Sequence, residues 1–155
     1  MTAQRDTFNL HHRSYAAPSR PVVAVCIDGC DPAYIEQGLD DGILPNIQRF
    51  YDTGFGAPAE AVVPTFTNPN NLSIVTGAPQ SVHGISGNYF LDPLKQEAVM
   101  LNDPAYVRCA TLPAVLSHHG SKVVIITAKD KLRRMLGHQL RGICFSAERA
   151  AECTL

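Results

Sequence analysis

Two short apolar runs stand out along the chain, and both are typical of strands that are buried on two faces. Residues 22–27 read Val-Val-Ala-Val-Cys-Ile, and residues 122–127 read Lys-Val-Val-Ile-Ile-Thr. Apolar residues follow one another in each run without the alternation of a half-exposed strand, which favours central strands of a parallel sheet. A shorter run over residues 59–63 predicts a further strand that ends at Pro64.

Proline and glycine mark helices between these strands. Asp31-Pro32 has the form of an N-cap followed by proline at the first helical position, so a helix is expected from there to Gln37. The same signals predict helices over residues 45–52, 68–76, 104–119 and 131–136, with glycine after several of them. Between the third and fourth helices, residues 77–93 are expected to form a long ordered loop.

The alternation of strands and helices indicates an α/β fold with a mostly parallel sheet and flanking helices. Residues 1–20 are expected as a flexible N-terminal arm, and residues 21–155 as one domain. Hydrophobic residues make up 45% of the chain and charged residues 17%, and the net charge is −1. These values predict a globular protein and exclude a basic nucleic-acid wrapper.

Membrane spanning is not expected, because no apolar run approaches the roughly 20 residues that a spanning helix needs. The first twenty residues carry no secretory signal, so we expect a cytoplasmic protein without nucleic-acid or membrane partners. Five cysteines without CxxC spacing argue against a disulfide framework.

Polar residues follow both apolar runs directly. Ligands of parallel sheets bind beyond the carboxyl ends of the strands, so Asp28 and residues 127–131 should border one crevice. A carboxylate held at a strand end can bind a metal or act as a nucleophile. An Asx turn is the alternative interpretation of Asp28.

Thr65 and Thr67 place two hydroxyls immediately before a predicted helix, whose N-terminal amides favour an anion such as phosphate. A threonine hydroxyl needs a base or a metal to become a good nucleophile. The alternative is that Thr67 is only an N-cap. In the glycine-rich residues 76–88, P-loop and GxGxxG motifs are absent, and His83 is interpreted as a structural histidine rather than a metal ligand.

Four segments together resemble the alkaline phosphatase superfamily: VCIDGCDPAYIEQG, GILPNIQRF, PTFTNPNNLSIVTGAPQSVHGISGNYF and ITAKDKLR. The similarity covers residues from about 21 to the end and looks most like the phosphonoacetate hydrolase family. The nucleotide pyrophosphatase/phosphodiesterase branch shares the threonine before the helix and the TG…P…HGI…N pattern. The AKDK segment, which we do not expect in that branch, decides between the two.

The resemblance implies a site for metal-dependent hydrolysis of the carbon–phosphorus bond of phosphonoacetate to acetate and phosphate. By this resemblance Asp28 is a metal ligand, and Thr67 is the nucleophile, bound as its alkoxide to one of two zinc ions. Asn88 would donate to a phosphonate oxygen, and Lys129 and Lys131 would bind the carboxylate of the substrate. The resemblance is also compatible with a homodimer of this protein.

The sequence departs from the family in its later part. A two-metal site draws further ligands from later Asp and His residues, but no aspartate follows Asp130, and His138 is the one histidine in the last 36 residues. We therefore expect an N-terminal part of such a hydrolase that is inactive alone. A non-catalytic remnant is another reading; a haloacid dehalogenase-like phosphatase fits less well, because its DxD motif would need an aspartate at Cys30.

Overall fold

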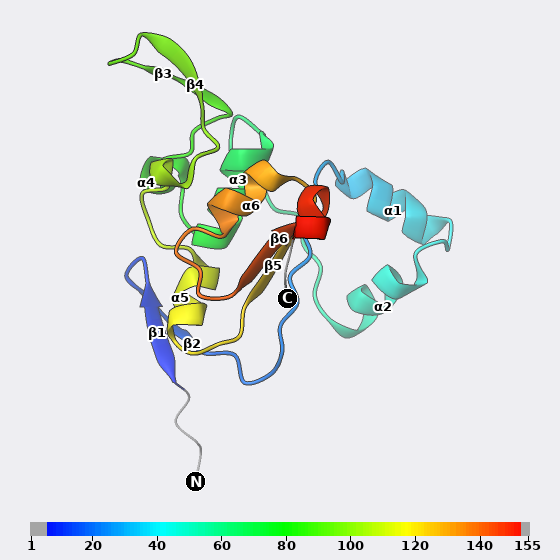
Figure 1. The fold of residues 1–155 in the computed structure, drawn as a ribbon. Helices are drawn as coiled ribbons and strands as arrows, with labels where there is room; N and C mark the ends of the chain where they lie inside the picture. The colour runs from blue at the N-terminus through cyan, green and yellow to red at the C-terminus, as the bar shows by residue number, and fades with distance from the viewer. Residues whose placement is uncertain (1–5, 153–155) are drawn as a thin grey trace. The chain divides into compact units, whose positions relative to one another are not determined.

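The computed structural model describes residues 6–152. Residues 1–5 of the arm expected over residues 1–20, and the last of the five cysteines, Cys153, lie outside the described part. The chain divides into a first unit, Met1–Arg20 with Val62–Leu155, and a second unit, Pro21–Ala61. Figure 1 shows the ribbon of both units, and each is described by itself.

The second unit consists of two helices, as the sequence predicts: α1 (Pro32–Asp40) and α2 (Pro45–Thr53). The Asp31 carboxylate accepts a hydrogen bond of 2.8 Å from the amide of Ala33, which confirms it as the N-cap of α1. Proline stands at the start of both helices, where its missing N–H costs no hydrogen bond.

The first unit contains all the strands that the structure describes. Its elements in chain order are β1 (Thr7–Leu10), β2 (Arg13–Ala16), α3 (Thr67–Thr76), α4 (Gln80–His83), β3 (Tyr89–Asp92), β4 (Glu97–Met100), the 3-10 turn η1 (Pro104–Tyr106), α5 (Leu112–His118), β5 (Val124–Thr127), α6 (Asp130–Leu136), β6 (Ile143–Ser146) and the 3-10 segment η2 (Ala147–Glu152).

These strands form three sheets of two strands each. The pairs β1–β2 and β3–β4 are antiparallel hairpins, and β5–β6 is parallel. The mixed α/β class is therefore confirmed, whereas a mostly parallel sheet is not, since one of the three pairs is parallel. Within residues 6–152, no helix is long and apolar enough to cross a membrane.

Two predicted strands are absent from the described residues, and this corrects the sequence analysis. Residues 22–27 and 59–63 belong to no sheet, and the side chains of Val22, Val23, Val25 and Ile27 are all exposed. An apolar sequence favours a strand, but a strand forms only where its backbone pairs with a neighbouring strand. Neither run has a hydrogen-bonded neighbour strand in the part of the chain that the structure describes.

Residues 7–16, expected as part of a flexible arm, form the β1–β2 hairpin instead. Phe8 and Leu10 are buried, and the Phe8 ring stacks on Tyr15 with 5.6 Å between ring centroids. Phe8 also lies 5.6 Å from the ring of His119, at the end of α5. Contacts with a distant part of the chain therefore give this segment a structure that its composition does not suggest.

The core of the first unit lies between α3, α6 and the segments that lead into and out of the β3–β4 hairpin. Its buried residues are Leu72, Ile85, Leu101, Val107, Met135 and Leu136. The helix expected over residues 104–119 is interrupted: η1 ends at Tyr106 and α5 begins at Leu112. Thr111 caps α5 through a 3.2 Å hydrogen bond from the amide of Ala114, while Val107 turns into the core.

Candidate functional site

Thr67 is the first residue of α3 and is half-buried. The N-cap is Phe66, in an extended conformation and without a side-chain cap. The interpretation of Thr67 as only an N-cap is therefore wrong. A helix start without a side-chain cap leaves backbone amides that suit an anion, and Thr67 stands at that start.

Asn70 fixes the loop that leads into α3. Its Nδ2 donates a 3.0 Å hydrogen bond to the carbonyl of Phe66, and its Oδ1 accepts one of 3.1 Å from the amide of Val62. One side chain thus ties both ends of the 62–66 loop to the first turn of the helix. This brace limits the positions that the Thr67 backbone can take.

Asn68, Leu101 and Asn88 form a chain of contacts that links α3 to the base of the β3–β4 hairpin. Asn68 is fully buried, and its Nδ2 donates a 3.0 Å hydrogen bond to the carbonyl of Leu101. The amide of Leu101 donates one of 2.7 Å to the carbonyl of Asn88. The structure therefore brings Asn88 into the same local network as the residue next to Thr67.

The side-chain oxygens of Asn68 and Asn88 are buried, and neither has a hydrogen-bond partner among the described residues. A buried acceptor that lacks a donor costs about 1–3 kcal/mol. Sequence reasoning treated Asn68 only as part of a helix start and missed its role in the link to Leu101. The signal was the density of asparagines in the run Asn-Pro-Asn-Asn, which exceeds what a helix start needs.

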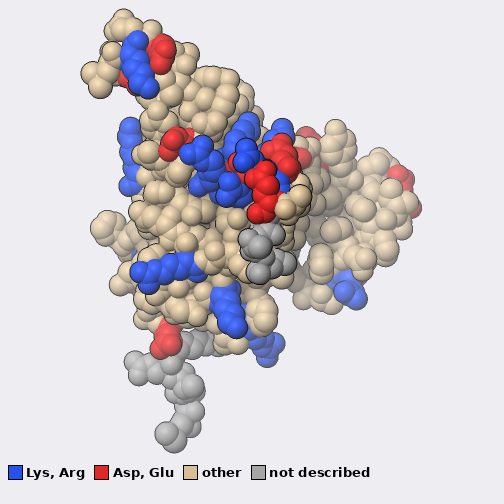
Figure 2. Space-filling view, viewed as in Figure 1, with Lys and Arg blue, Asp and Glu red and all other residues tan. Residues whose placement is uncertain are grey.

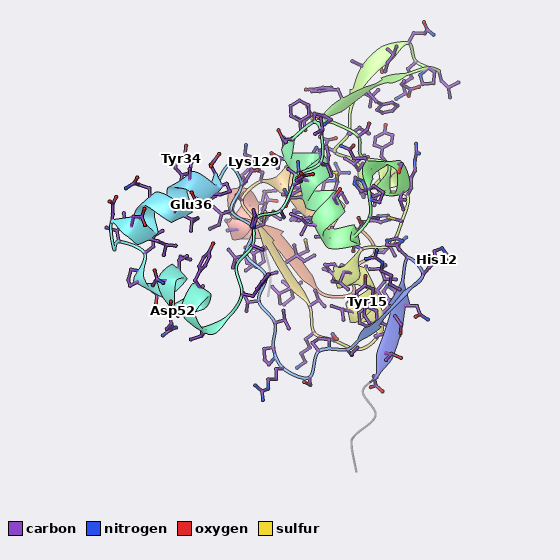
Figure 3. The ribbon with its side chains drawn as sticks, turned by 180° about the vertical axis from the view of Figure 1, so that it is seen from behind. His12, Tyr15, Tyr34, Glu36, Asp52 and Lys129 are labelled. Carbon is purple, nitrogen blue, oxygen red and sulfur yellow. The ribbon has the colours of Figure 1, made fainter. Side chains whose placement is uncertain are left out.

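Lys129 and Lys131 stand at the start of α6, which packs against α3. Lys129, labelled in Figure 3, is the N-cap of α6 and is exposed, and Lys131 is half-buried. Thr127 fixes the backbone before the helix, because its hydroxyl donates a 3.0 Å hydrogen bond to the carbonyl of Lys129. Both lysines therefore follow the end of β5, as the sequence predicts.

Carboxylates also gather at this helix start, and Figure 2 shows acidic and basic side chains mixed over α6 and η2. Glu148 accepts a 2.7 Å hydrogen bond from the amide of Asp130. Arg133 donates one of 2.6 Å to Asp130 and holds the pKa of that carboxyl below its ordinary value. These acids interact favourably with the start of the helix and offset the positive charge of the two lysines there.

Asp28 belongs to the second unit, whereas the other candidate residues belong to the first. It is exposed in a turn in which the amide of Cys30 donates a 3.4 Å hydrogen bond to the carbonyl of Ile27. Gly29 in this turn has a φ of +72°, a conformation that residues with a side chain rarely adopt. The turn gives the carboxylate a defined place between residues 22–27 and α1.

His83 is a structural histidine, as the sequence analysis expects. It is fully buried; its Nε2 lies 2.9 Å from Ser73 Oγ, and its Nδ1 accepts a 3.1 Å hydrogen bond from the amide of Ile85. The acceptor role of Nδ1 requires the unprotonated ring atom. Burial lowers the pKa of His83, so the fold favours the neutral imidazole.

This pKa shift predicts a loss of stability in mild acid. With the pKa lowered in the fold, the unfolded chain binds more protons than the folded chain just below the ordinary value of about 6.5. The free energy of unfolding should therefore be greatest above that value and fall as the pH drops through it. Urea unfolding from pH 8 to pH 5 measures this, and His83→Gln should flatten the profile while the variant of an exposed histidine, His12→Gln, should not. An unchanged profile in His83→Gln would contradict the assignment.

A complete metal centre is not found in the described part of the chain. Within residues 6–152, no three His, Cys, Asp or Glu side chains gather into a group that could hold a metal ion. The residues present therefore do not fit two zinc ions by themselves.

Comparison with known proteins gives concordant matches. Residues 22–146 match the family model described as type I phosphodiesterase / nucleotide pyrophosphatase. Two crystal structures of phosphonoacetate hydrolase from Sinorhizobium meliloti, one in complex with phosphonoacetate and one with phosphonoformate, match 97% of this chain with a TM-score of 0.92 and identities of 42% and 43%. The resemblance inferred from the sequence motifs is thereby confirmed.

A curated relative from Schizosaccharomyces pombe, an uncharacterised pyrophosphatase/phosphodiesterase, is 33% identical over 73 residues, or 47% of this chain. The chain spans 38% of the length of the solved hydrolase chains and 14% of the length of the curated relative.

Proposed function

Because the chain belongs to the type I phosphodiesterase / nucleotide pyrophosphatase family, we propose that it carries the nucleophile and the substrate-binding lysines of a hydrolase that cleaves the carbon–phosphorus bond of phosphonoacetate. The observation that supports this most is the match to phosphonoacetate hydrolase, at 42% identity over 97% of the chain. The braced start of α3, with Thr67 in its first turn, is the local feature that suits attack on a phosphoryl group.

In the proposed reaction, the Thr67 hydroxyl loses its proton and attacks phosphorus. The bond from phosphorus to carbon breaks, and its electron pair passes to a carbon next to a carboxylate, where it delocalises as an enediolate. Protonation of that carbon gives acetate. Water then releases phosphate from phosphothreonine, so the sum is phosphonoacetate plus water to acetate plus phosphate.

Asn88 is proposed to donate a hydrogen bond to a phosphonate oxygen, and Lys129 and Lys131 to bind the substrate carboxylate. Ammonium groups near that carboxylate stabilise the negative charge that develops there as the carbon–phosphorus bond breaks. Asp28 is proposed as a metal ligand in a hydrolase of the relatives' full length, where two zinc ions would lower the pKa of the threonine hydroxyl. In this proposal the side chains of this chain bind the substrate and attack phosphorus, but they do not by themselves lower the pKa of the threonine hydroxyl.

A nucleotide pyrophosphatase/phosphodiesterase activity is the second candidate, favoured by the family model and by the yeast relative. That chemistry expels an oxygen leaving group, which needs no carboxylate to delocalise charge. The two functions therefore differ in whether Lys129 and Lys131 need to bind a substrate carboxylate.

A hybrid enzyme tests the proposal directly. In it, this chain replaces the matching part of the Sinorhizobium meliloti phosphonoacetate hydrolase, which supplies the rest of that protein. The expected result is release of phosphate from phosphonoacetate. A folded hybrid that cleaves nucleotide diesters and leaves phosphonoacetate intact would favour the second function instead.

The isolated 155-residue chain should release no phosphate from phosphonoacetate at an enzymatic rate, and it should bind zinc weakly. A catalytic zinc site uses about three protein ligands, and no group of three lies within residues 6–152. Titration with zinc followed by calorimetry, together with a phosphate assay, measures both properties. Tight stoichiometric zinc binding or rapid turnover by the isolated chain would contradict this prediction.

A further inference from the structure

Glu148, in the 3-10 segment η2, bonds to the backbone on both sides of Lys129. Its carboxylate accepts a 2.7 Å hydrogen bond from the amide of Asp130, which lies 18 positions earlier, and its own amide donates one of 3.3 Å to the carbonyl of Ala128. The two segments meet because β5 and β6 are parallel and end in register. The backbone at Lys129 is therefore held by an element distant in sequence.

Further hydrogen bonds anchor the same turn. The Thr127 hydroxyl donates one of 3.0 Å to the carbonyl of Lys129. The Asp130 carboxylate accepts one of 3.2 Å from the hydroxyl of the buried Ser146, at the end of β6, and pairs with Arg149 of η2 at 3.6 Å. The end of β6 and η2 thus hold the first turn of α6.

The acids of this turn are bonded to groups other than the two lysines. Glu148 accepts from a backbone amide, and Asp130 pairs with arginines. Among residues 6–152, no ion pair involves Lys129 or Lys131. Both ammonium groups can therefore still pair with an anionic substrate.

We propose that Glu148 is a positioning residue, which places Lys129 and thereby sets the preference for a substrate with a carboxylate. This inference rests on the proposed function, in which Lys129 binds that carboxylate. A charge-assisted hydrogen bond depends on the position of the ammonium group, whereas attack on phosphorus at the start of α3 does not use this turn. Loss of Glu148 should therefore weaken recognition of the carboxylate selectively.

A purely electrostatic effect of Glu148 would have the opposite sign. Removing a negative charge beside two lysines favours binding of an anion. A fall in activity after Glu148→Ala therefore reports the position of the turn. Glu148→Gln separates charge from hydrogen bonding, because its amide oxygen can still accept from the backbone.

The test compares phosphonoacetate with an aryl phosphonate ester that lacks a carboxylate, in the hybrid enzyme. Glu148→Ala should lower kcat/KM for phosphonoacetate roughly tenfold and that for the ester less than about twofold, while Glu148→Gln should keep most of the activity on both. Glu152→Ala is the matched control, since Glu152 is an exposed acid of the same segment that pairs with Arg149 at 3.3 Å. It should change neither value.

Amide hydrogen exchange of the 155-residue chain tests the contact without any assay of activity. Exchange at the Asp130 amide should be faster in Glu148→Ala and unchanged in Glu152→Ala. Unchanged exchange in Glu148→Ala, equal losses on the two substrates, or a Glu148→Gln loss as large as that of Glu148→Ala would overturn the inference.

Failure of the proposed function gives a different result. A hybrid without activity on phosphonoacetate, or equal losses on both substrates in Lys129→Ala, would overturn the role of the lysine and this inference with it. A selective loss in Lys129→Ala together with no loss in Glu148→Ala would overturn this inference alone.

Discussion

Thr67→Ala should abolish hydrolysis of phosphonoacetate by the hybrid enzyme, with kcat lowered at least about 1,000-fold. The substitution removes the proposed nucleophilic oxygen and leaves the backbone amides of α3 in place. Binding of substrate through those amides should survive, so KM should change far less than kcat. Steady-state measurement of phosphate release by the unsubstituted and substituted hybrids gives both constants.

Two further variants separate nucleophilic attack from a structural effect. Thr67→Ser retains a hydroxyl and should keep partial activity, whereas Thr65→Ala removes an exposed hydroxyl two residues earlier and should change kcat little. Trapping of a phosphorylated Thr67 peptide after an acid quench would identify the intermediate. If Thr67→Ala retained most of its kcat, the attacking group would have to be water.

The helices of this protein are predictable from sequence because their ends are set locally. Asp31-Pro32 and Gly77 act through contacts within a few residues, and the structure has α1 and α3 beginning or ending where these signals place them. The break between η1 and α5 was missed because Val107 is drawn into the core by residues distant in sequence. Local signals do not report such contacts.

The strands, unlike the helices, are not predictable from local sequence. Residues 22–27 have the sequence of a buried strand and no strand partner in the described chain, while residues 7–16 have no strong strand pattern and form a hairpin. Pairing, which depends on residues far along the chain, decides both cases. The β3–β4 hairpin was missed for the same reason.

The sequence indicates which residue types belong to the candidate site. It does not indicate the hydrogen bonds that connect the residues around Thr67. The threonine before an apolar run identifies a helix start, and the structure has Thr67 in the first turn of α3. The hydrogen bond of Asn68 to Leu101 joins positions 33 residues apart, and Leu101 in turn contacts Asn88. Neither contact can be read from the spacing of residues in the sequence.

Lys129→Ala and Lys131→Ala should each lower kcat/KM of the hybrid for phosphonoacetate by on the order of 10- to 100-fold. A charge-assisted hydrogen bond to a carboxylate contributes about 1.5–3 kcal/mol, which corresponds to that range. The effect should be larger in kcat than in KM, because an enediolate carries more negative charge on the carboxylate oxygens than the bound substrate does.

Hydrolysis of an aryl phosphonate ester without a carboxylate should change much less in the same two variants, since its leaving oxygen needs no such stabilisation. Arg134→Ala serves as a control, because Arg134 is an exposed basic residue of the same helix that pairs with Asp103 at 3.7 Å. The Arg134→Ala substitution should leave kcat/KM for both substrates nearly unchanged. Equal losses on the two substrates in the lysine variants would mean that the lysines support the fold or the phosphoryl group. The carboxylate of the substrate would then need another partner, and the case for phosphonoacetate over a nucleotide diester would lose its chemical basis.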